Sequence, residues 1–151
     1  MDMPAISLAA VPGRRKTIIE FARESESRGF AGIYLPSLGD NMSLATVLAT
    51  ATSTITFGTS ITPIYFRAPL DLAQAAAFIH EVSDGRFRFG VGIAHAPSHV
   101  RYGVSVGKPL TDTRTFVETI RGAERIGDLP PIVLATLRKK MIGLAGEIAE
   151  G

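Results

Sequence analysis

The stretch ITFGTSITP (residues 55–63) decides the fold, because a run of β-branched and apolar residues that ends in Gly, Thr and Ser is typical of a buried strand closed by a turn. A helical segment follows at 70–79 (LDLAQAAAFI), and a turn with a second strand follows at 83–93 (SDGRFRFGVGI). Two consecutive strand-to-helix units predict parallel strands joined by helical crossovers. Any ligand is then expected at the carboxyl ends of the strands.

The same alternation continues on both sides of this stretch. Further strands are predicted at 5–11, 30–35 and 132–135, and further helices at 16–28, 41–51, 111–126 and 139–149. The pattern therefore predicts five strands and five helices in strict alternation. Residues 94–110 hold two His, two Pro and two Gly, so we expect a long loop of the kind that is functional or mobile.

Composition narrows the class of protein. The chain has 151 residues, of which 46% are hydrophobic, with a net charge of +2 and no cysteine. It is long enough for one domain but short of the roughly 250 residues of a complete eight-stranded α/β barrel. Its basic residues do not interleave with aromatics, and no apolar run reaches the roughly 18 residues of a membrane span. We expect one cytoplasmic domain over residues 1–151 that acts on a small molecule, without nucleic acid or membrane.

Histidine supplies the candidate acid–base group. His95 and His99 have i, i+4 spacing, but Pro97 between them argues against a regular helix, so we expect no metal site. His95 comes just past the end of the 83–93 strand, where an imidazole can exchange a proton with a bound ligand. An equally good interpretation is that His95 is a loop residue without a role in chemistry.

The glycines Gly90 and Gly92 have two interpretations. With Val91 they match half of a phosphate-binding glycine fingerprint, but the third glycine is missing. Close packing of a neighbouring helix, or bending of the strand, explains them better. Composition and spacing alone lead to a parallel α/β domain with a site at the strand ends.

A series of motifs resembles those of the bacterial-luciferase-like flavin and deazaflavin oxidoreductases, whose fold is a (β/α)8 TIM-type barrel. These motifs are ESRGFAGIY (26–34), FGTSITP (57–63) with RAP (67–69), and SDGRFRFGVG (83–92). The stretches YG (102–103), GKPLTDTRTFV (107–117) and PPIVLA (130–135) look like those of the branch that uses coenzyme F420. The resemblance spans nearly the whole chain.

This resemblance implies an oxidoreductase that transfers a hydride between coenzyme F420 and an organic substrate. An FMN-dependent monooxygenase of the same fold is the alternative within the family. A non-catalytic remnant of the barrel, acting as a scaffold, is the alternative from another class.

The resemblance also implies positions for the cofactor. A cis peptide bond at Ser60-Ile61 would lie behind the cofactor ring, and Ile93, Ala94 and His95 would line it, with Ser98 nearby. Thr136 and Leu137 fall where backbone amides meet the cofactor phosphate, and Arg138 departs from the family's usual Gly-Pro pair there. The second strand ends in Pro36-Ser37 instead of Asp-His, so His95 is the candidate catalytic proton donor.

The length of the chain departs from the family pattern. Five strand–helix units are present, and the C-terminal strands of the barrel are missing. We favour a fragment of a longer barrel over a sheet completed by a partner chain or a second copy. Open parallel edges expose backbone groups that a closed barrel pairs, so we expect a homo-oligomer instead of a lone monomer.

Overall fold

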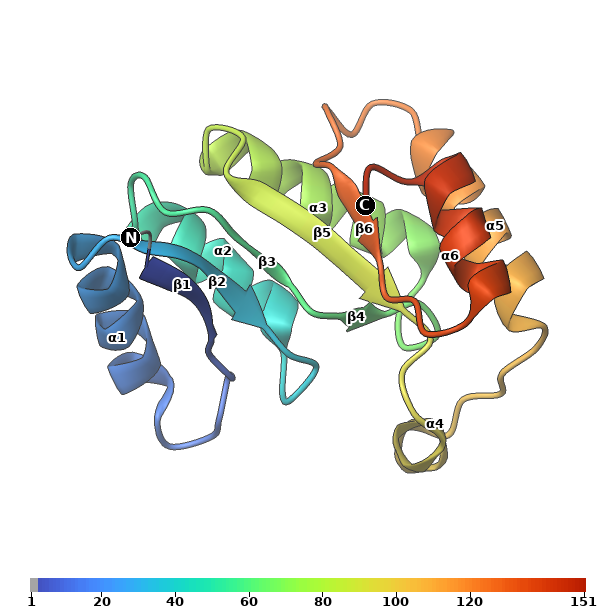
Figure 1. The fold of residues 1–151 in the computed structure, drawn as a ribbon, viewed down its shortest axis with the longest axis horizontal. Helices are drawn as coiled ribbons and strands as arrows, with labels where there is room; N and C mark the ends of the chain where they lie inside the picture. Colours follow the sequence, from blue (N-terminus) through green and yellow to red (C-terminus); the bar gives the residue numbers. More distant parts are fainter. Residues whose placement is uncertain (1–2) are drawn as a thin grey trace.

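The described strands all run parallel, and their connecting helices form a layer on one face of the sheet (Figure 1). The computed structural model describes residues 3–151. The strands are β1 (Met3–Ser7), β2 (Phe30–Leu35), β3 (Phe57–Thr59), β4 (Thr62–Pro63), β5 (Phe87–Gly92) and β6 (Ile132–Leu134). The helices are α1 (Arg15–Ser27), α2 (Asn41–Ala51), α3 (Pro69–Val82), α4 (Ala96–Tyr102), α5 (Pro109–Arg121) and α6 (Lys139–Ile148). The α/β class is therefore as predicted.

Strand order in the sheet follows chain order, as in successive units of a (β/α)8 barrel. β1 pairs with β2, β2 pairs with β3, and β5 lies between β3 and β6. β4 continues the line of β3, because Val91 of β5 has Thr62 on one side and Leu134 on the other. The architecture consists of five barrel-type units with the third strand in two pieces.

The break in the third strand is a bulge. Gly58 opposes Arg88 and Thr62 opposes Val91, so four steps along the third strand match three steps along β5. One extra residue therefore lies in the third strand, as in a β-bulge. Residues 55–63 were predicted as one strand, because strand-forming residues continue on both sides of the break.

The prediction of residues 94–110 as an irregular loop is wrong, because α4 forms within it. Pro97 lies in the first turn of α4, where the missing proline N–H has no helical partner to lose. With the divided third strand, residues 3–151 contain six strands and six helices instead of five of each. The first strand also ends at Ser7 instead of Val11.

Phenylalanine side chains form the centre of the core between the sheet and the helices. Phe57, Phe87 and Phe89 are fully buried, and the ring centroids of Phe57 and Phe87 lie 5.5 Å apart. Side chains alternate between the two faces of a strand. Arg88, between two buried phenylalanines, therefore faces the side of the sheet that carries no described helix.

Gly90 allows β3 and β5 to approach closely. A Cβ built on Gly90 would lie 1.8 Å from the carbonyl oxygen of Thr59, a distance that no real atom pair tolerates. The glycine therefore serves close packing, but the predicted packing of a helix is wrong at Gly90. The neighbour is a strand instead of the expected helix.

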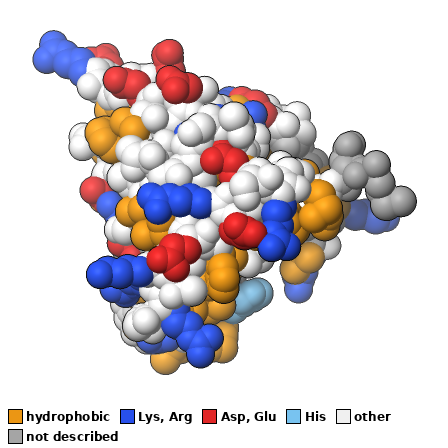
Figure 2. Space-filling view, turned by 90° about the vertical axis from the view of Figure 1, so that its left-hand side faces the viewer, with side chains coloured by type: hydrophobic (Ala, Val, Ile, Leu, Met, Phe, Trp, Pro, Cys, Tyr) orange, Lys and Arg blue, Asp and Glu red, His pale blue; other side chains and the backbone are white. Residues whose placement is uncertain are grey.

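The flank of the molecule that carries α1 has mixed charge. Figure 2 shows acidic and basic side chains interspersed on this face, with apolar side chains between them. Within α1 and its cap, Arg28 pairs with Glu24 at 2.6 Å. This alternation is typical of a solvent-exposed helix. None of the helices formed by residues 3–151 is long and apolar enough to cross a membrane.

Candidate functional site

Three segments meet at the carboxyl edge of the sheet: the break between β3 and β4, and the segments that follow β5 and β6. Gly92, the last residue of β5, lies at their meeting point. A Cβ built on Gly92 would lie 3.0 Å from Cβ of Ala135 and 3.2 Å from Cγ1 of Ile61. The absence of a side chain at Gly92 therefore leaves room for Ile61 and Ala135 to come together.

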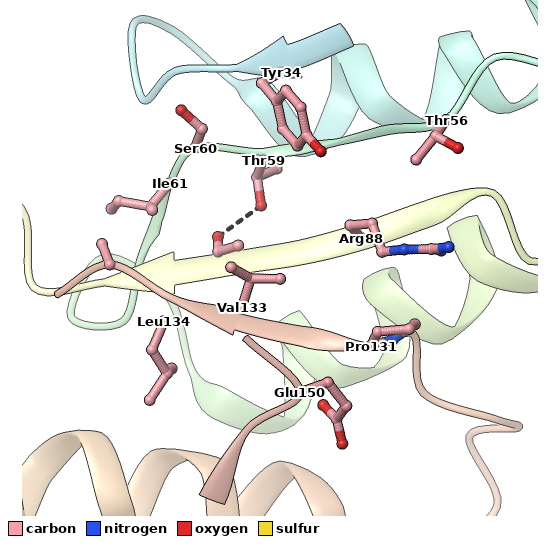
Figure 3. Close-up of a pocket in the computed structure, with 12 residues that line it drawn as sticks. Tyr34, Thr56, Thr59, Ser60, Ile61, Arg88, Pro131, Val133, Leu134 and Glu150 are labelled. Carbon is pink, nitrogen blue, oxygen red and sulfur yellow. Dashed lines mark hydrogen bonds between the residues drawn. The ribbon is translucent and has the colours of Figure 1, made fainter. Parts of the chain in front are cut away.

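A hollow of about 490 Å³ starts at this edge and runs along the strands (Figure 3). Ser60 and Ile61 lie at its carboxyl end, and Thr56 and Pro131 lie toward its amino end. The complete lining is Tyr34, Thr56, Thr59, Ser60, Ile61, Arg88, Gly90, Pro131, Val133, Leu134, Ala135 and Glu150. The lining combines an apolar wall from β6 with a few polar groups, the usual composition of a small-molecule site.

The structure brings two of the predicted site residues, Ser60 and Ile61, into this hollow. The other predicted residues follow β5 or β6 at the same edge but are outside the lining: Ile93, Ala94, His95, Ser98, Thr136, Leu137 and Arg138.

Hydrogen bonds hold the break in the third strand between its neighbours. The peptide bond Ser60-Ile61 is cis, so this expectation from the family resemblance is confirmed. The N–H of Ser60 donates to the carbonyl oxygen of Leu35 at 2.8 Å. On the other side, the hydroxyl of Thr59 donates to the carbonyl oxygen of Gly90 at 2.7 Å, the dashed line in Figure 3. The break is thus attached to both β2 and β5.

The structure distinguishes the two histidines after β5. His95 is the exposed N-cap residue of α4, and its ring does not line the hollow. His99 is partly buried, and its Nε2 makes a short contact with the carbonyl oxygen of Ile93. From its sequence position, His99 was a candidate only for metal binding. Within residues 3–151, no group of three or more His, Cys, Asp or Glu side chains could hold a metal ion.

An aromatic cluster, which sequence analysis missed, attaches α4 to the carboxyl edge. Phe66 stacks on Tyr102 with ring centroids 4.2 Å apart, and the ring of His99 meets Tyr65 edge-on at 6.0 Å. The hydroxyl of Tyr65 donates to Asp112 at 2.8 Å. Burial, this hydrogen bond and the charge of Asp112 raise the pKa of Tyr65 above its ordinary value of 10.0. The adjacent aromatic residues Tyr65 and Phe66 were the feature of the sequence that could have indicated this cluster.

The segment after β6 presents positive charge at the beginning of α6. Arg138 is the N-cap residue, and Lys139 and Lys140 open the helix without an acidic residue in its first turn. All three side chains are exposed, and Leu137 is 94% exposed. The first backbone amides of a helix favour anions, and the basic side chains add to this field.

Arg88 contributes a positive charge inside the hollow, in addition to the basic residues at the beginning of α6. Its guanidinium donates to the carbonyl oxygens of Gly85 and Phe87, at 2.9 and 3.0 Å, and to no described acidic side chain. Glu150 lines the same hollow, but its carboxylate accepts from Arg121 at 2.7 Å and from the N–H of Ile132 at 2.8 Å. The amino end of the hollow therefore keeps a net positive group.

A smaller hollow of about 230 Å³ lies beside the carboxyl end of β2, between α2 and α4. Asp40, Arg67 and Tyr102 are among its lining residues. Burial raises the pKa of Asp40, but hydrogen bonds from the hydroxyl and N–H of Ser43 outweigh it, and the pKa lies below its ordinary value. Asp40 is the first acid after β2, and it caps α2.

Comparisons with known proteins agree with this architecture. The family model described as luciferase-like monooxygenase matches residues 4–151. A 5,10-methylenetetrahydromethanopterin reductase of Methanolobus tindarius is 29% identical over 158 residues, which cover 89% of this chain and 48% of the relative. The chain therefore spans about half the length of this curated relative.

Solved structures show the same fold. The coenzyme F420-dependent tetrahydromethanopterin reductase of Methanopyrus kandleri superposes with a TM-score of 0.83 at 21% identity, over 99% of this chain and 54% of its own. A type II Baeyer-Villiger monooxygenase from Pseudomonas putida, solved in complex with FMN, gives a TM-score of 0.68 at 15% identity, over 80% and 39%. The family model covers nearly every residue, and the TIM-barrel type of fold agrees with it: this chain belongs to the luciferase-like monooxygenase family.

Proposed function

We propose that this chain forms the cofactor-binding part of an oxidoreductase that transfers a hydride between coenzyme F420 and an organic substrate. One observation carries the proposal. Ser60 and Ile61 lie at the carboxyl end of a 490 Å³ hollow. The chain belongs to the luciferase-like family, and an F420-dependent reductase is among the solved structures that share its fold. The bound cofactor would supply the hydride-carrying carbon of its deazaflavin ring.

The residues of the chain would bind and orient this cofactor. Ser60 and Ile61 would lie against its ring, and Ile93, Ala94 and Ser98 would border it from the segment after β5. The backbone amides of residues 136–138, at the beginning of α6, would hold the phosphate. Arg138 strengthens the positive field at this place.

His95 stays the candidate proton donor. Its exposed ring, at the segment that follows β5, would meet a substrate above the carboxyl edge. Its test is the pH profile of His95→Gln in the assembled enzyme, in which the loss of one ionisation is the expected result.

An FMN-dependent monooxygenase is the second candidate function. The FMN-bound monooxygenase from Pseudomonas putida shares the fold. A scaffold without a cofactor is the third. We also expect the protein to be cytoplasmic and homo-oligomeric, which fractionation and light scattering would check.

A parallel titration with F420 and FMN tests these functions. We expect saturable binding of F420, seen in cofactor fluorescence and as a rise in the melting temperature. Binding of FMN alone would favour the monooxygenase, and binding of neither would overturn the proposed cofactor site.

A pair of variants tests the place of binding. Ser60→Phe fills the carboxyl end of the hollow and should abolish binding with the helical content preserved. Ser27→Phe places the same bulk on an exposed residue at the end of α1 and should bind normally. Normal binding by Ser60→Phe would locate the ring elsewhere.

A further inference from the structure

A single buried amide lies directly behind the break in the third strand. Asn41 is the only asparagine in the sequence, it begins α2, and it is 5% exposed. Its Nδ2 donates to the carbonyl oxygen of Leu35 at 3.2 Å and to that of Ile61 at 3.1 Å. Leu35 ends β2, so one side chain connects the beginning of a helix, the end of a strand and the bulge.

The carbonyl oxygen of Leu35 receives two hydrogen bonds from this region. One comes from Asn41 and the other from the backbone N–H of Ser60, at 2.8 Å. Ser60 is therefore fixed through its backbone, whereas Ile61 is fixed through the Asn41 side chain. Both residues line the carboxyl end of the 490 Å³ hollow, whereas Asn41 is outside that lining and lines the smaller hollow of about 230 Å³ instead.

The chemistry of the side chain matters at this position. A neutral amide offers two N–H groups, and both can serve carbonyl oxygens at the same time. The Oδ1 atom of Asn41 in turn lies 3.4 Å from the hydroxyl of Thr62. Aspartate has the same shape but only acceptor atoms when ionised, so it would face two carbonyl oxygens with no hydrogen to share.

We propose that Asn41 is a positioning residue that holds Ser60 and Ile61 in the orientation that binds the cofactor ring. The inference rests on the proposed function. Asn41 does not line the 490 Å³ hollow and acts on it through the carbonyl oxygen of Ile61. Without its amide, Ile61 loses the connection to α2 and shifts relative to Gly92 and Ala135, the residues that it meets at the edge.

The test compares the two ends of α2. Asn41→Asp removes the shared donor, and Asn41→Ala removes it without adding an acceptor. Thr52→Val is the matched control: Thr52 follows α2 at its other end and is 5% exposed. Its hydroxyl donates to the carbonyl oxygen of Leu48 at 2.7 Å and accepts from the guanidinium of Arg86 at 2.9 Å. Each variant loses two side-chain hydrogen bonds or more, but only those of Asn41 reach a residue that lines the 490 Å³ hollow.

The measurement is a fluorescence titration of each variant with F420, at a temperature below all the melting transitions. We expect both Asn41 variants to bind about tenfold or more weakly, as misplacement of a binding group produces. Thr52→Val should bind within about twofold of the wild type although its melting temperature also falls. Circular dichroism checks that each variant is folded. If Asn41→Asp does not fold, the test uses Asn41→Ala alone.

Each contrary outcome has a separate meaning. Unchanged affinity in a folded Asn41 variant overturns the positioning role and leaves the proposed function standing. An equal loss of affinity in Thr52→Val shows a general effect of stability and also overturns it. A wild-type chain that binds neither F420 nor FMN overturns the proposed function, and the role of Asn41 falls with it.

Discussion

The two ends of the parallel sheet differ in how they are held together. At the amino end, the guanidinium of Arg86 donates to Thr52 Oγ1 and to the carbonyl oxygens of Ile55, Ala49 and Thr52, at 2.8 to 3.2 Å. It also lies over the ring of Phe57, 5.4 Å from its centroid. One side chain thus connects the end of α2, the entry to the third strand and the beginning of β5.

A carboxylate reinforces the amino end. One oxygen of Glu26 accepts the backbone N–H groups of Ser53, Thr54 and Ile55, at 2.8, 2.6 and 2.9 Å. The carboxyl end has an open hollow, a break in one strand and exposed loops instead. In α/β barrels the amino end generally carries stability and the carboxyl end carries the site, and the hydrogen bonds of Arg86 and Glu26 agree with the first half of this division.

The largest expected effect comes from crowding the contact between β3 and β5, two strands that run between these ends. Gly90→Ala places a Cβ against the backbone of Thr59, which cannot move without breaking the pairing of β3 with β5. We expect the free energy of unfolding to fall by about 3 kcal/mol or more, measured by urea denaturation.

Gly146→Ala is the control for this substitution. Gly146 lies inside α6 with no atom within 4 Å of an added Cβ, so alanine should raise stability by about 0.5 to 1 kcal/mol there. Equal behaviour of the two variants would contradict the close contact between the strands.

A substitution of Arg86 should lower the stability of the fold without changing cofactor binding, and its effect should be the second largest. Arg86→Lys keeps the charge but has one nitrogen in place of the fork that reaches Thr52, Ile55 and Ala49. We expect a loss of about 2 kcal/mol in the free energy of unfolding. The affinity for F420 should stay unchanged, and a selective loss of affinity would break the comparison between the ends.

A smaller effect should depend on pH. Burial raises the pKa of Glu26, but the hydrogen bonds from residues 53–55 outweigh it, so the folded-state pKa lies below the ordinary value of 4.5. The carboxylate therefore stabilises the fold above about pH 4.5, and this contribution is lost as the pH falls through the folded-state pKa.

Glu26→Gln measures this contribution. Because the group is largely solvated, we expect a loss of only about 0.5 to 1 kcal/mol at pH 7. The difference from the wild type should shrink in acid, as urea midpoints at several pH values would show. A difference that is constant with pH would mean that the charge has no part in it.

The smallest effect lies at the carboxyl end. Ala94 has a φ of 60°, in the left-handed region where a Cβ is unfavourable. Ala94→Gly should therefore raise the free energy of unfolding, by about 1 kcal/mol at most, because the flexible unfolded chain offsets part of the gain. Thermal unfolding would show it, and a lower melting temperature would mean that the Ala94 methyl packs usefully.

Sequence patterns predicted the sheet well because the strands are short, apolar and separated by turn residues. The 30–35 strand and the helices around it match the structure nearly residue for residue. The motif SDGRFRFGVG was one of those that carried the family resemblance, and the structure explains two of its residues. Arg86 connects α2 and the third strand to β5 at the amino end of the sheet, and Gly90 allows β3 to approach β5 closely. Arg86 serves the fold alone, whereas Gly90 and the nearby Arg88 also line the hollow, so the motif covers part of the candidate site as well.

The site was harder to predict because its residues act through geometry. Periodicity cannot show that residues 55–63 contain a bulge, or that α4 begins at a proline. Arg88 and Asn41 looked like ordinary polar residues until the sheet placed one in the hollow and the other behind it. The cis bond at Ser60-Ile61 was predicted from the family resemblance alone.

The agreement between strand order and chain order has a consequence for synthesis on the ribosome. Each strand pairs with the strand before it, at the distance of one crossover. A growing chain can therefore dock every new unit onto an edge that already exists, without waiting for a distant segment. In this arrangement the edge that a new unit needs is already synthesised when that unit emerges.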